Sequence, residues 1–339
     1  MPVAGWADHD GSVRMRVLVT GGRSLLARHV VQQLMDRGDD VVVLQRTSSG
    51  LACDEVLGDI TDAGAVGQAV RGAEAIIHCA ARVSVTGPWS EFERVNVVGT
   101  RVLLAAARAS GVRRFIHIST PSVAHIGRSL VGAGAGPAEP DRARGHYARS
   151  KAMAELEVLA GDGPDLAVVA LRPHLVWGPG DEQLIGRIVS RARQGRLVIL
   201  GSGAALIDTI VVENAADAII HALDRAEQPQ VRGGVFVLSN GEPRPVAELL
   251  REIARACGAP APQRHVPVRI AWLAGWIAER VWRGLGKSTD PPMTSFLAEQ
   301  LSTAHWFDQR DVRRALEWTP RVSIDEGLRR LVAEDVPEA

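Results

Sequence analysis

The 339-residue sequence predicts an α/β protein in which a doubly wound parallel sheet of about seven strands joins a smaller, mostly helical carboxyl-terminal lobe. Short runs of apolar, β-branched residues alternate with segments whose apolar residues recur at helical spacing. This alternation is typical of a parallel sheet covered by helices on both faces. The composition agrees, because 46% of the residues are hydrophobic, enough for one large core or two modest ones.

The first element carries a signature of its own. Residues 16–20 (RVLVT) form a short apolar strand, and Gly21 and Gly22 follow directly. Apolar residues then recur at helical spacing between positions 26 and 34. A strand, a glycine turn and a helix in this order open a dinucleotide-binding unit.

The later elements continue the alternation as far as Pro173. Strands of the buried type are expected at residues 41–45, 75–79, 113–119, 166–171 and 235–238, with helices at 62–70, 97–109 and 147–159. Beyond Pro173 the pattern loosens, and helices are expected at residues 183–194, 215–226, 246–257 and 325–333. The run of Gly, Ala and Pro over 131–140 predicts a loop.

These elements divide the chain into two parts. Residues 15–172 are expected to form the dinucleotide-binding domain, with residues 211–240 returning to it. Residues 173–210 and 241–333 are expected to form the substrate-binding lobe, and residues 1–14 a flexible leader. Ligands of such folds bind in the cleft outside the carboxyl ends of the parallel strands.

Composition and charge exclude several functions. The formal net charge is +0 at pH 7, so the chain has no electrostatic footprint for nucleic acid. The three cysteines are scattered, which favours a reducing cytoplasm without a disulfide framework. Neither CxxC nor HExxH spacing occurs, so no metal site is predicted. No stretch reaches the roughly 18 apolar residues of a membrane-spanning helix.

One pair of residues stands out against the composition. Tyr147 is the only tyrosine, and Lys151, four residues later, is one of only two lysines. On a helix this spacing puts both side chains on one face, where an ammonium can favour ionisation of a phenol. The phenol then becomes a usable proton donor or acceptor nearer neutrality. The alternative is a surface tyrosine beside a lysine that forms a salt bridge.

Seven short motifs occur in order along the chain. They are TGG at 20–22, GDI at 58–60, HCAA at 78–81, NVVGT at 96–100, HISTPSV at 117–123, YARSK at 147–151 and LRPHLVWGPGD at 171–181. With them, residues 15–332 resemble the extended short-chain dehydrogenase/reductase family. The segments VVENAADA and PPMTSFLAEQLSTAHWFD resemble its 3β-hydroxysteroid dehydrogenase/isomerase-like branch, within the epimerase/dehydratase superfamily. The resemblance implies a Rossmann-type fold and an NAD(P)-dependent oxidoreductase.

The resemblance also implies catalytic roles. Tyr147 would be the general acid or base, and Lys151 would bind the nicotinamide ribose and lower the pKa of the phenol. Thr120 would hydrogen-bond the reacting oxygen, and its alternatives are the neighbouring Ser119 and Ser122. Asn96 would hold a water or a backbone group near the lysine, or would instead cap the helix that follows it.

The same resemblance implies where the cofactor binds. The expected contacts are Gly21, Gly22, Ser24, Leu25, Leu26, Arg46, Asp59, Ile60, Ala80, Ala81, Tyr147, Lys151, Pro173 and Leu175. Ser24 and Ala27 depart from the glycines of the family pattern. A serine Cβ would intrude where the backbone approaches a pyrophosphate, although its hydroxyl could donate to the phosphate.

The end of the second strand bears on the choice of cofactor. NAD enzymes usually place a carboxylate there to bind the ribose 2′-hydroxyl, whereas this strand ends in Gln45 and Arg46. Glutamine does not repel a 2′-phosphate, and arginine can pair with it. The sequence therefore favours NADP(H) over NAD(H), against the alternative that Arg46 is merely solvated.

The expected substrate is a small hydrophobic alcohol or ketone. Sugar-nucleotide members often carry an arginine before the aspartate that corresponds to Asp208, but Ile207 stands there. The branch implies a sterol-like compound or a long-chain β-keto or β-hydroxy acid. The alternatives are a nucleotide-sugar epimerase or dehydratase and a noncatalytic NADP-sensing protein. The candidate substrate contacts are Ser122, His174 and Asn214, and two further histidines, His125 and His146, are expected near the cleft.

A tryptophan-rich segment in the carboxyl-terminal third has no assigned role. Its residues at helical spacing are Trp272, Leu273, Trp276, Ile277 and Arg280. Residues 270–283 are interpreted as a substrate lid, as an interfacial helix that contacts a membrane surface, or as packing of the small lobe or of a dimer. We expect a cytoplasmic protein, with peripheral membrane contact through this segment as one interpretation. The family implies a homodimer through the helices at 97–109 and 147–159.

Overall fold

The computed structural model describes residues 14–84, 86–124, 129–284 and 294–332, and it confirms the predicted fold class. Seven parallel strands form one sheet. In sheet order they are β12 (Val235–Leu238), β7 (Ala167–Pro173), β5 (Arg114–Ile118), β4 (Ala75–His78), β1 (Arg16–Thr20), β2 (Asp40–Gln45) and β3 (Asp54–Leu57). The sequence analysis missed β3, an edge strand with no buried residue. Residues 1–13 of the predicted leader and His125 lie outside the described residues.

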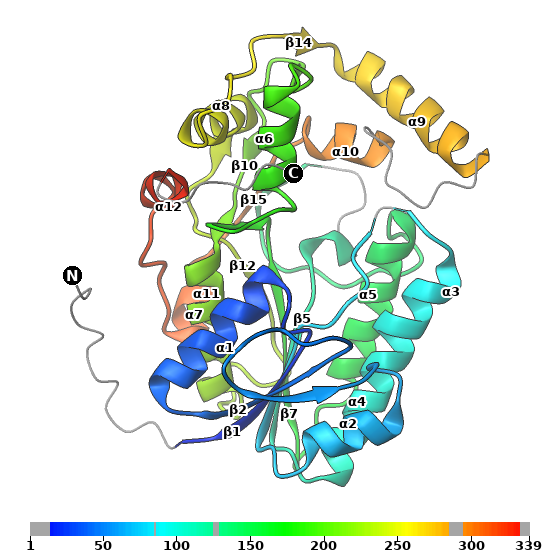
Figure 1. Cartoon of the computed structure of the whole chain (residues 1–339), viewed down its shortest axis with the longest axis vertical. Coiled ribbons are helices and arrows are strands. Elements are labelled where there is room, and N and C mark those ends of the chain that lie inside the picture. The colour runs from blue at the N-terminus through cyan, green and yellow to red at the C-terminus, as the bar shows by residue number, and fades with distance from the viewer. Residues whose placement is uncertain (1–13, 85, 125–128, 285–293, 333–339) are drawn as a thin grey trace.

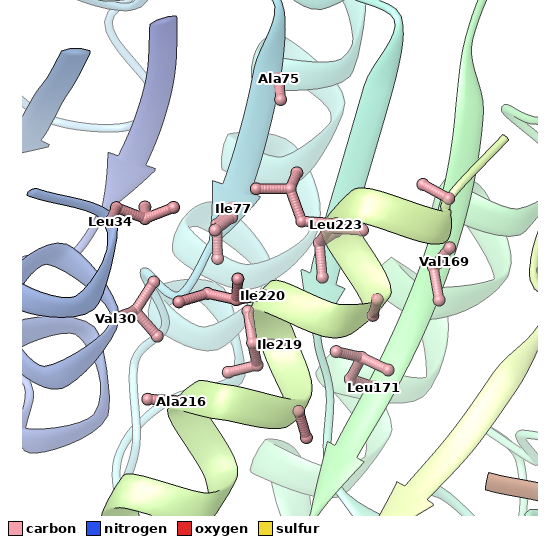
Figure 2. Packing of buried hydrophobic residues seen from close by; sticks show 14 of the residues in the cluster. Val30, Leu34, Ala75, Ile77, Val169, Leu171, Ala216, Ile219, Ile220 and Leu223 are labelled. Atoms are coloured by element: carbon pink, nitrogen blue, oxygen red, sulfur yellow. The ribbon is translucent and has the colours of Figure 1, made fainter. Parts of the chain in front are cut away.

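Helices cover both faces of this sheet. One face carries α1 (Leu25–Arg37) and α7 (Val212–Arg225), and the other carries α2 (Ala63–Val70), α4 (Gly99–Ala109) and α5 (Gly145–Leu159). Successive strand residues point to opposite faces, so Ile77 belongs to the first core and Ile76 to the second. Figure 2 shows the first core, in which side chains of α1 and α7 meet beside strands β4 and β7.

The remaining segments form a smaller lobe, drawn above the sheet in Figure 1. Helices α6 (Ile185–Arg193), α8 (Val246–Ala256) and α12 (Ile324–Leu331) share a core with the fully buried Trp177. A second sheet has the order β13 (Arg244–Pro245), β10 (Leu206–Ile207), β15 (His305–Phe307) and β6 (Leu130–Ala133). Two short pairs complete the lobe: β8 (Val176–Trp177) with β11 (Ile210–Val211), and β9 (Ile199–Leu200) with β14 (His265–Val266).

Strand β6 differs from the loop expected over residues 131–140. It pairs in parallel with β15, so a segment of the dinucleotide-binding half forms one edge of the second lobe's sheet. The pairing joins residues more than a hundred positions apart and leaves no mark in the local glycine-rich composition.

The helix expected at 97–109 also begins earlier than predicted. It is continuous with α3 (Trp89–Phe92) and with a π-helical segment, η1 (Glu93–Val98). At the far end of the small lobe lie α9 (Val268–Gly284) and α10 (Ser295–Gln300), while α11 (Arg310–Leu316) packs near α7 (Figure 1). Among the described residues, no helix has both the length and the apolar character needed to cross a bilayer.

Candidate active site

The residues expected to bind a cofactor lie in turns at the carboxyl ends of adjacent parallel strands. Gly21 and Gly22 follow β1, Arg46 follows β2, Asp59 and Ile60 follow β3, Ala80 and Ala81 follow β4, and Leu175 follows β7, which ends at Pro173. These ends share one edge of the sheet, which is where ligands of doubly wound folds bind.

The turn after β1 has no room for a side chain. Gly21 has a φ of +76°, and a Cβ there would lie 2.8 Å from the Cα of Ala80. A Cβ at Gly22 would lie 2.5 Å from Cγ1 of Val43. Only glycine fits both positions without displacing its neighbours. The turn therefore presents bare backbone at the start of α1, where N–H groups can approach a phosphate.

The two departures from the glycine pattern fit the local structure. Ser24 is the N-cap of α1 with a φ of −69°, so its position does not need the conformational freedom of glycine. Its Oγ accepts a hydrogen bond from the N–H of Ala27 at 3.2 Å. Ala27 is fully buried in the core that α1 shares with the sheet. Leu25 and Leu26, which follow the cap, are partly buried in the first turn of the helix.

A second arginine, Arg23, lies beside the end of β2, and sequence reasoning missed it. Arg46 is exposed just beyond the strand, and Arg23 of the glycine turn donates to Oγ1 of Thr47 at 2.9 Å. Gln45 is 7% exposed and donates from Nε2 to Glu55 at 2.9 Å. Its Oε1 has no hydrogen-bond partner within the described part of the chain. Arg23 gives no signal in the sequence, because only the fold of the turn brings it to β2.

The turns after β3 and β7 differ in character. Oδ1 of Asp59 accepts hydrogen bonds from the N–H and the hydroxyl of Thr61, at 3.0 and 2.7 Å. Partial burial opposes ionisation, but hydrogen bonds from Thr61 and Arg94 hold the pKa of Asp59 below its usual value. Ile60 is buried against Gly99. Leu175 has a φ of +48°, a strained conformation for a residue with a side chain and one that clusters at functional sites.

Tyr147 and Thr120 meet at this edge of the sheet. Tyr147 lies in the first turn of α5, and Thr120 precedes the 3-10 turn η2 (Pro121–Val123) that follows β5. The two side chains are hydrogen-bonded, and Thr120 Oγ1 lies 2.8 Å from Ser122 Oγ. Burial raises the pKa of Tyr147 to about 12, while the hydrogen bond with Thr120 acts to lower it. Ser119 is 6% exposed, and its Oγ has no hydrogen-bond partner among the described residues.

Lys151, one turn further along α5, is 3% exposed. Its Nζ donates to the carbonyl oxygen of Ile118 at 2.6 Å and lies 3.3 Å from Nε2 of His117. Burial lowers the pKa of Lys151 to about 8, although the carboxylate of Glu155 acts to raise it. The expectation that Lys151 lowers the pKa of Tyr147 is not met in this structure. The ammonium turns toward the end of β5, and burial dominates at the phenol.

Asn96 links helix α5 to the turn after β4. Its Oδ1 accepts from the N–H of Arg82 at 2.7 Å, and its Nδ2 donates to Ser150 Oγ at 2.8 Å. Ser150 in turn donates to the carbonyl oxygen of Tyr147 at 2.8 Å. Asn96 lies inside the π-helical segment η1 and caps no helix, which excludes the capping alternative. Such π-helical segments occur frequently at functional sites.

A buried histidine that sequence reasoning left without a role extends this network to β1. His78 Nε2 lies 2.9 Å from Thr100 Oγ1, and His78 Nδ1 lies 2.8 Å from Thr20 Oγ1. Thr100 donates to the carbonyl oxygen of Asn96, and Thr20 accepts from the N–H of Ala80. Because Thr100 uses its hydrogen for Asn96, His78 donates from Nε2, and a neutral ring then accepts at Nδ1. The ring is neutral because burial lowers the pKa of His78 to about 3.

The three substrate candidates are placed differently. Ser122 lies beside Thr120, with which it shares a hydrogen bond. His174 is 7% exposed, with Nδ1 2.6 Å from the carbonyl oxygen of Asp208 and its ring against Phe307. Asn214 belongs to α7, on the face of the sheet opposite α5, and its buried amide binds Asn240 and the backbone at residues 321–322. These hydrogen bonds hold α7 to the segment at residues 321–322, and Asn214 lies on the other side of the sheet from Tyr147.

His146, the other histidine expected near the cleft, lies between two aromatic rings and a backbone carbonyl. His146 Nδ1 lies 3.1 Å from the carbonyl oxygen of Gly87, and its ring packs edge-on against Trp89 and Phe92. It therefore joins the start of α5 to the segment that leads into α3.

Comparison with known proteins agrees with this architecture. Residues 18–268 match the 3-beta hydroxysteroid dehydrogenase/isomerase family. The chain is 40% identical over 327 residues to a 2-alkyl-3-oxoalkanoate reductase of Stenotrophomonas maltophilia, covering 94% of this chain and 99% of that protein. It is 31% identical over 329 residues to a 3 beta-hydroxysteroid dehydrogenase/Delta 5-->4-isomerase of Mycobacterium tuberculosis, covering 92% and 88%.

The solved structures agree on the fold. A dTDP-glucose 4,6-dehydratase double mutant from Streptomyces venezuelae, with NAD bound, superposes with a TM-score of 0.72 at 26% identity, covering 94% of this chain and 96% of that one. The chain therefore belongs to the 3-beta hydroxysteroid dehydrogenase/isomerase family and is an oxidoreductase of the extended short-chain dehydrogenase/reductase type.

Proposed function

We propose that the protein is an NADP(H)-dependent reductase of a hydrophobic ketone, with a long-chain β-keto acid as the preferred class and a sterol-like ketone as the next. One observation carries the proposal. The hydrogen-bonded pair of Tyr147 and Thr120, with Lys151 one turn away, lies at the sheet edge that also holds the glycine turn. A proton donor therefore stands beside a place suited to a dinucleotide.

The residues present fit a nicotinamide dinucleotide. The bare turn at Gly21 and Gly22 and the start of α1 would hold the pyrophosphate. Arg23 and Arg46, both exposed, would pair with a 2′-phosphate beside the neutral Gln45. When bound, such a cofactor supplies the hydride for ketone reduction. The preference for NADP(H) rests on these two arginines.

The chain's own groups would manage the proton. With its pKa raised to about 12, Tyr147 stays protonated at neutral pH and is ready to give its proton to a ketone oxygen. Thr120 would donate a hydrogen bond to that oxygen, and Ser122 would share the network. The neutral phenol favours the reductive direction, because alcohol oxidation needs the phenol to accept a proton.

The relatives support a hydrophobic substrate. One is named for reduction of 2-alkyl-3-oxoalkanoates, which are β-keto acids, and another for a steroid. Ile207 is buried where sugar-nucleotide enzymes often carry an arginine, and Asp208 beside it accepts a hydrogen bond from Ser239 at 2.6 Å. This arrangement offers a diphosphate no cation at that place. The homodimer expected through α4 and α5 remains a prediction; Leu156 of α5 is 42% exposed.

The experiment is a substrate panel followed by nicotinamide absorbance. The purified protein is mixed with NADPH or NADH and with a 2-alkyl-3-oxo acid, a 3-ketosteroid or a sugar nucleotide, and the Tyr147→Phe variant serves as the blank. We expect NADPH oxidation with the oxo acid. Conversion of a sugar nucleotide without net cofactor oxidation would identify an epimerase instead. Cofactor binding without turnover of any compound would identify a sensor.

A further inference from the structure

The buried histidine His117 of β5 has no role in the proposed reaction. Its side chain is fully buried. The alternation along β5 turns it, like Phe115, toward the face of the sheet that α4 and α5 cover. His78 of β4 is its neighbour across the sheet, and the two ring centres lie 5.4 Å apart. The two histidines differ in how fully they are hydrogen-bonded.

One ring nitrogen of His117 has no partner. Both ring nitrogens of His78 lie within 2.9 Å of a threonine hydroxyl. In His117, Nε2 lies 3.3 Å from Nζ of Lys151, but the buried Nδ1 has no hydrogen-bond partner within the described part of the chain. A buried polar atom without a partner costs stability, and native structures contain few of them. A phenylalanine would fill this place without that cost, which indicates that His117 does more than pack.

The contact with Lys151 has a defined direction. Burial and the nearby charge of Lys151 hold the pKa of His117 well below its usual value, so the ring is neutral. A charged lysine has three N–H donors and no acceptor, so Nζ donates and Nε2 of His117 accepts. The carbonyl oxygen of Ile118 accepts a second N–H at 2.6 Å. One N–H of the ammonium is then left for a ligand.

We propose that His117 is a positioning residue that, together with the carbonyl oxygen of Ile118, holds the ammonium of Lys151 at the end of β5. Both acceptors belong to an interior strand of the seven-stranded sheet, which fixes them in place. They keep the lysine charged and orient it, so that its third N–H can meet the ligand of the site. His117 touches neither cofactor nor substrate in this arrangement and acts only through Lys151.

The other titratable groups around the lysine do not take this part. On α5 itself, the carboxylate of Glu155 acts on the lysine through its charge but is bound to β7 in an ion pair, and burial raises the pKa of Tyr147 to about 12. On β4, His78 hydrogen-bonds two threonines. After β4, burial raises the pKa of the Cys79 thiol to about 12, so the thiol stays neutral. Among the described residues, His117 is therefore the one titratable side chain that accepts a hydrogen bond from this ammonium.

The proposal predicts how the charge of Lys151 depends on His117. A hydrogen bond to the ammonium favours its charged form, so His117 acts to raise the pKa of Lys151 against the burial that lowers it to about 8. His117→Phe keeps a flat ring but removes the acceptor, so the lysine should lose its proton at a pH about 1 unit lower. His117→Gln offers an amide oxygen near the place of Nε2 and should restore the original midpoint.

The test is NMR of the intact protein labelled with ¹³C-lysine, which needs neither turnover nor cofactor. The chain has only two lysines, so a Lys287→Arg background leaves the Cε signal of Lys151 alone. We expect this signal to titrate near pH 8 in that background. The midpoint should fall in His117→Phe and return in His117→Gln. His305→Phe, at a histidine 2% exposed on β15, is the control and should leave the midpoint unchanged.

A second measurement needs no variant that could fail to fold. In protein labelled with ¹⁵N-histidine, long-range ¹H–¹⁵N spectra distinguish which ring nitrogen carries the proton. We expect the proton of His117 on Nδ1 and the proton of His78 on Nε2. A proton on Nε2 of His117 would show that the lysine does not donate to it, and would overturn the proposal.

The effect on the reaction rests on the proposed function and is measured separately. In the reduction of an oxo acid by NADPH, the alkaline limb of kcat/KM should move to lower pH in His117→Phe and return in His117→Gln. A role in packing alone would not move this limb.

The outcomes that would overturn the proposal differ from those that would overturn the proposed function. A Lys151 midpoint unchanged in His117→Phe, or equally low in His117→Gln, would overturn the contact. A pH profile that stays in place while the midpoint moves would overturn its effect on the reaction. Failure of the unmodified protein to reduce any ketone would overturn the proposed function alone, because the two NMR measurements decide the contact by themselves.

Discussion

The two halves of α5 each present a charged residue to the protein interior, but in opposite ways. In the second half, Glu155 forms a fully buried ion pair with Arg172 of β7, with Oε1 2.5 Å from Nη2. In the first half, Lys151 has only uncharged partners within hydrogen-bonding distance, the Ile118 carbonyl and the His117 ring. The cation Arg172 is therefore neutralised by a carboxylate at contact distance. The cation Lys151 has no such partner, and burial lowers its pKa to about 8.

This difference distinguishes Arg172, whose charge stabilises the fold, from Lys151, whose charge remains available to a ligand. Arg172 also donates to the carbonyl oxygens of Ala135 and Gly136, so it fastens the loop after β6 to the sheet. Its charge and its donors are used within the fold. Lys151 is held in place at a cost in stability, which is common where a side chain must remain able to gain or lose a partner.

The largest effect is expected from breaking the ion pair. Arg172→Met leaves the buried Glu155 without its ion-pair partner, which typically costs about 3–5 kcal/mol. The free energy of unfolding, measured with urea, should fall by this amount. The double change Arg172→Met with Glu155→Leu should recover part of the loss, since it removes both charges. If the single variant is as stable as the unmodified protein, the ion pair between Arg172 and Glu155 contributes nothing to the stability of the fold.

The next effect concerns only the first half of the helix. Tyr147→Phe removes the proton donor while keeping the ring, so turnover should fall by at least roughly 10²-fold. Cofactor binding, measured by NADPH fluorescence, and the midpoint of unfolding should stay close to those of the unmodified protein. Turnover that survives the change would show that another group donates the proton.

Lys151→Met should show how much the buried charge of this lysine costs in stability. A pKa lowered from 10.5 to about 8 means that the folded chain binds fewer protons than the unfolded chain between these pH values. The charged lysine therefore costs stability below pH 8, and the cost disappears as pH rises to 10.5. The variant should be more stable at pH 7, by roughly 1–3 kcal/mol, and the gain should shrink toward pH 10. A variant less stable at pH 7 would show that the hydrogen bonds of Lys151 outweigh its burial.

A third cation, the exposed Arg46 at the end of β2, extends the comparison to the protein surface. Arg46→Ala should weaken NADPH binding about tenfold and leave NADH almost unchanged, because an exposed arginine acts mainly through a charged partner on the ligand. Stability should not change measurably. Arg314→Ala, at another exposed arginine, is the control. Equal weakening of both cofactors would mean that Arg46 does not contact a 2′-phosphate.

The sequence predicted the parts of the site that depend on local patterns. The glycine turn after β1 and the placement of Tyr147 and Lys151 one turn apart on a single helix follow from short-range spacing. The pairing of Glu155 with Arg172 was not predicted, because it forms only when α5 packs on β7. The hydrogen bonds of His78 likewise join three elements, so local composition gives no sign of them.

The π-helical segment shows a second limit of sequence reasoning. The motif identified Asn96 as a site residue but left its role open between holding a water or a backbone group near the lysine and capping the helix that follows. The wider turn of η1 places its amide between Arg82 and Ser150, an arrangement that helical periodicity does not predict.

Strand β6 has a practical consequence for engineering this protein. Because residues 130–133 of the first half complete a sheet built by the second, the substrate lobe cannot be exchanged as one contiguous block. A chimera that takes its carboxyl-terminal half from a relative must import this short strand as well, or the transplanted sheet will have a mismatched edge.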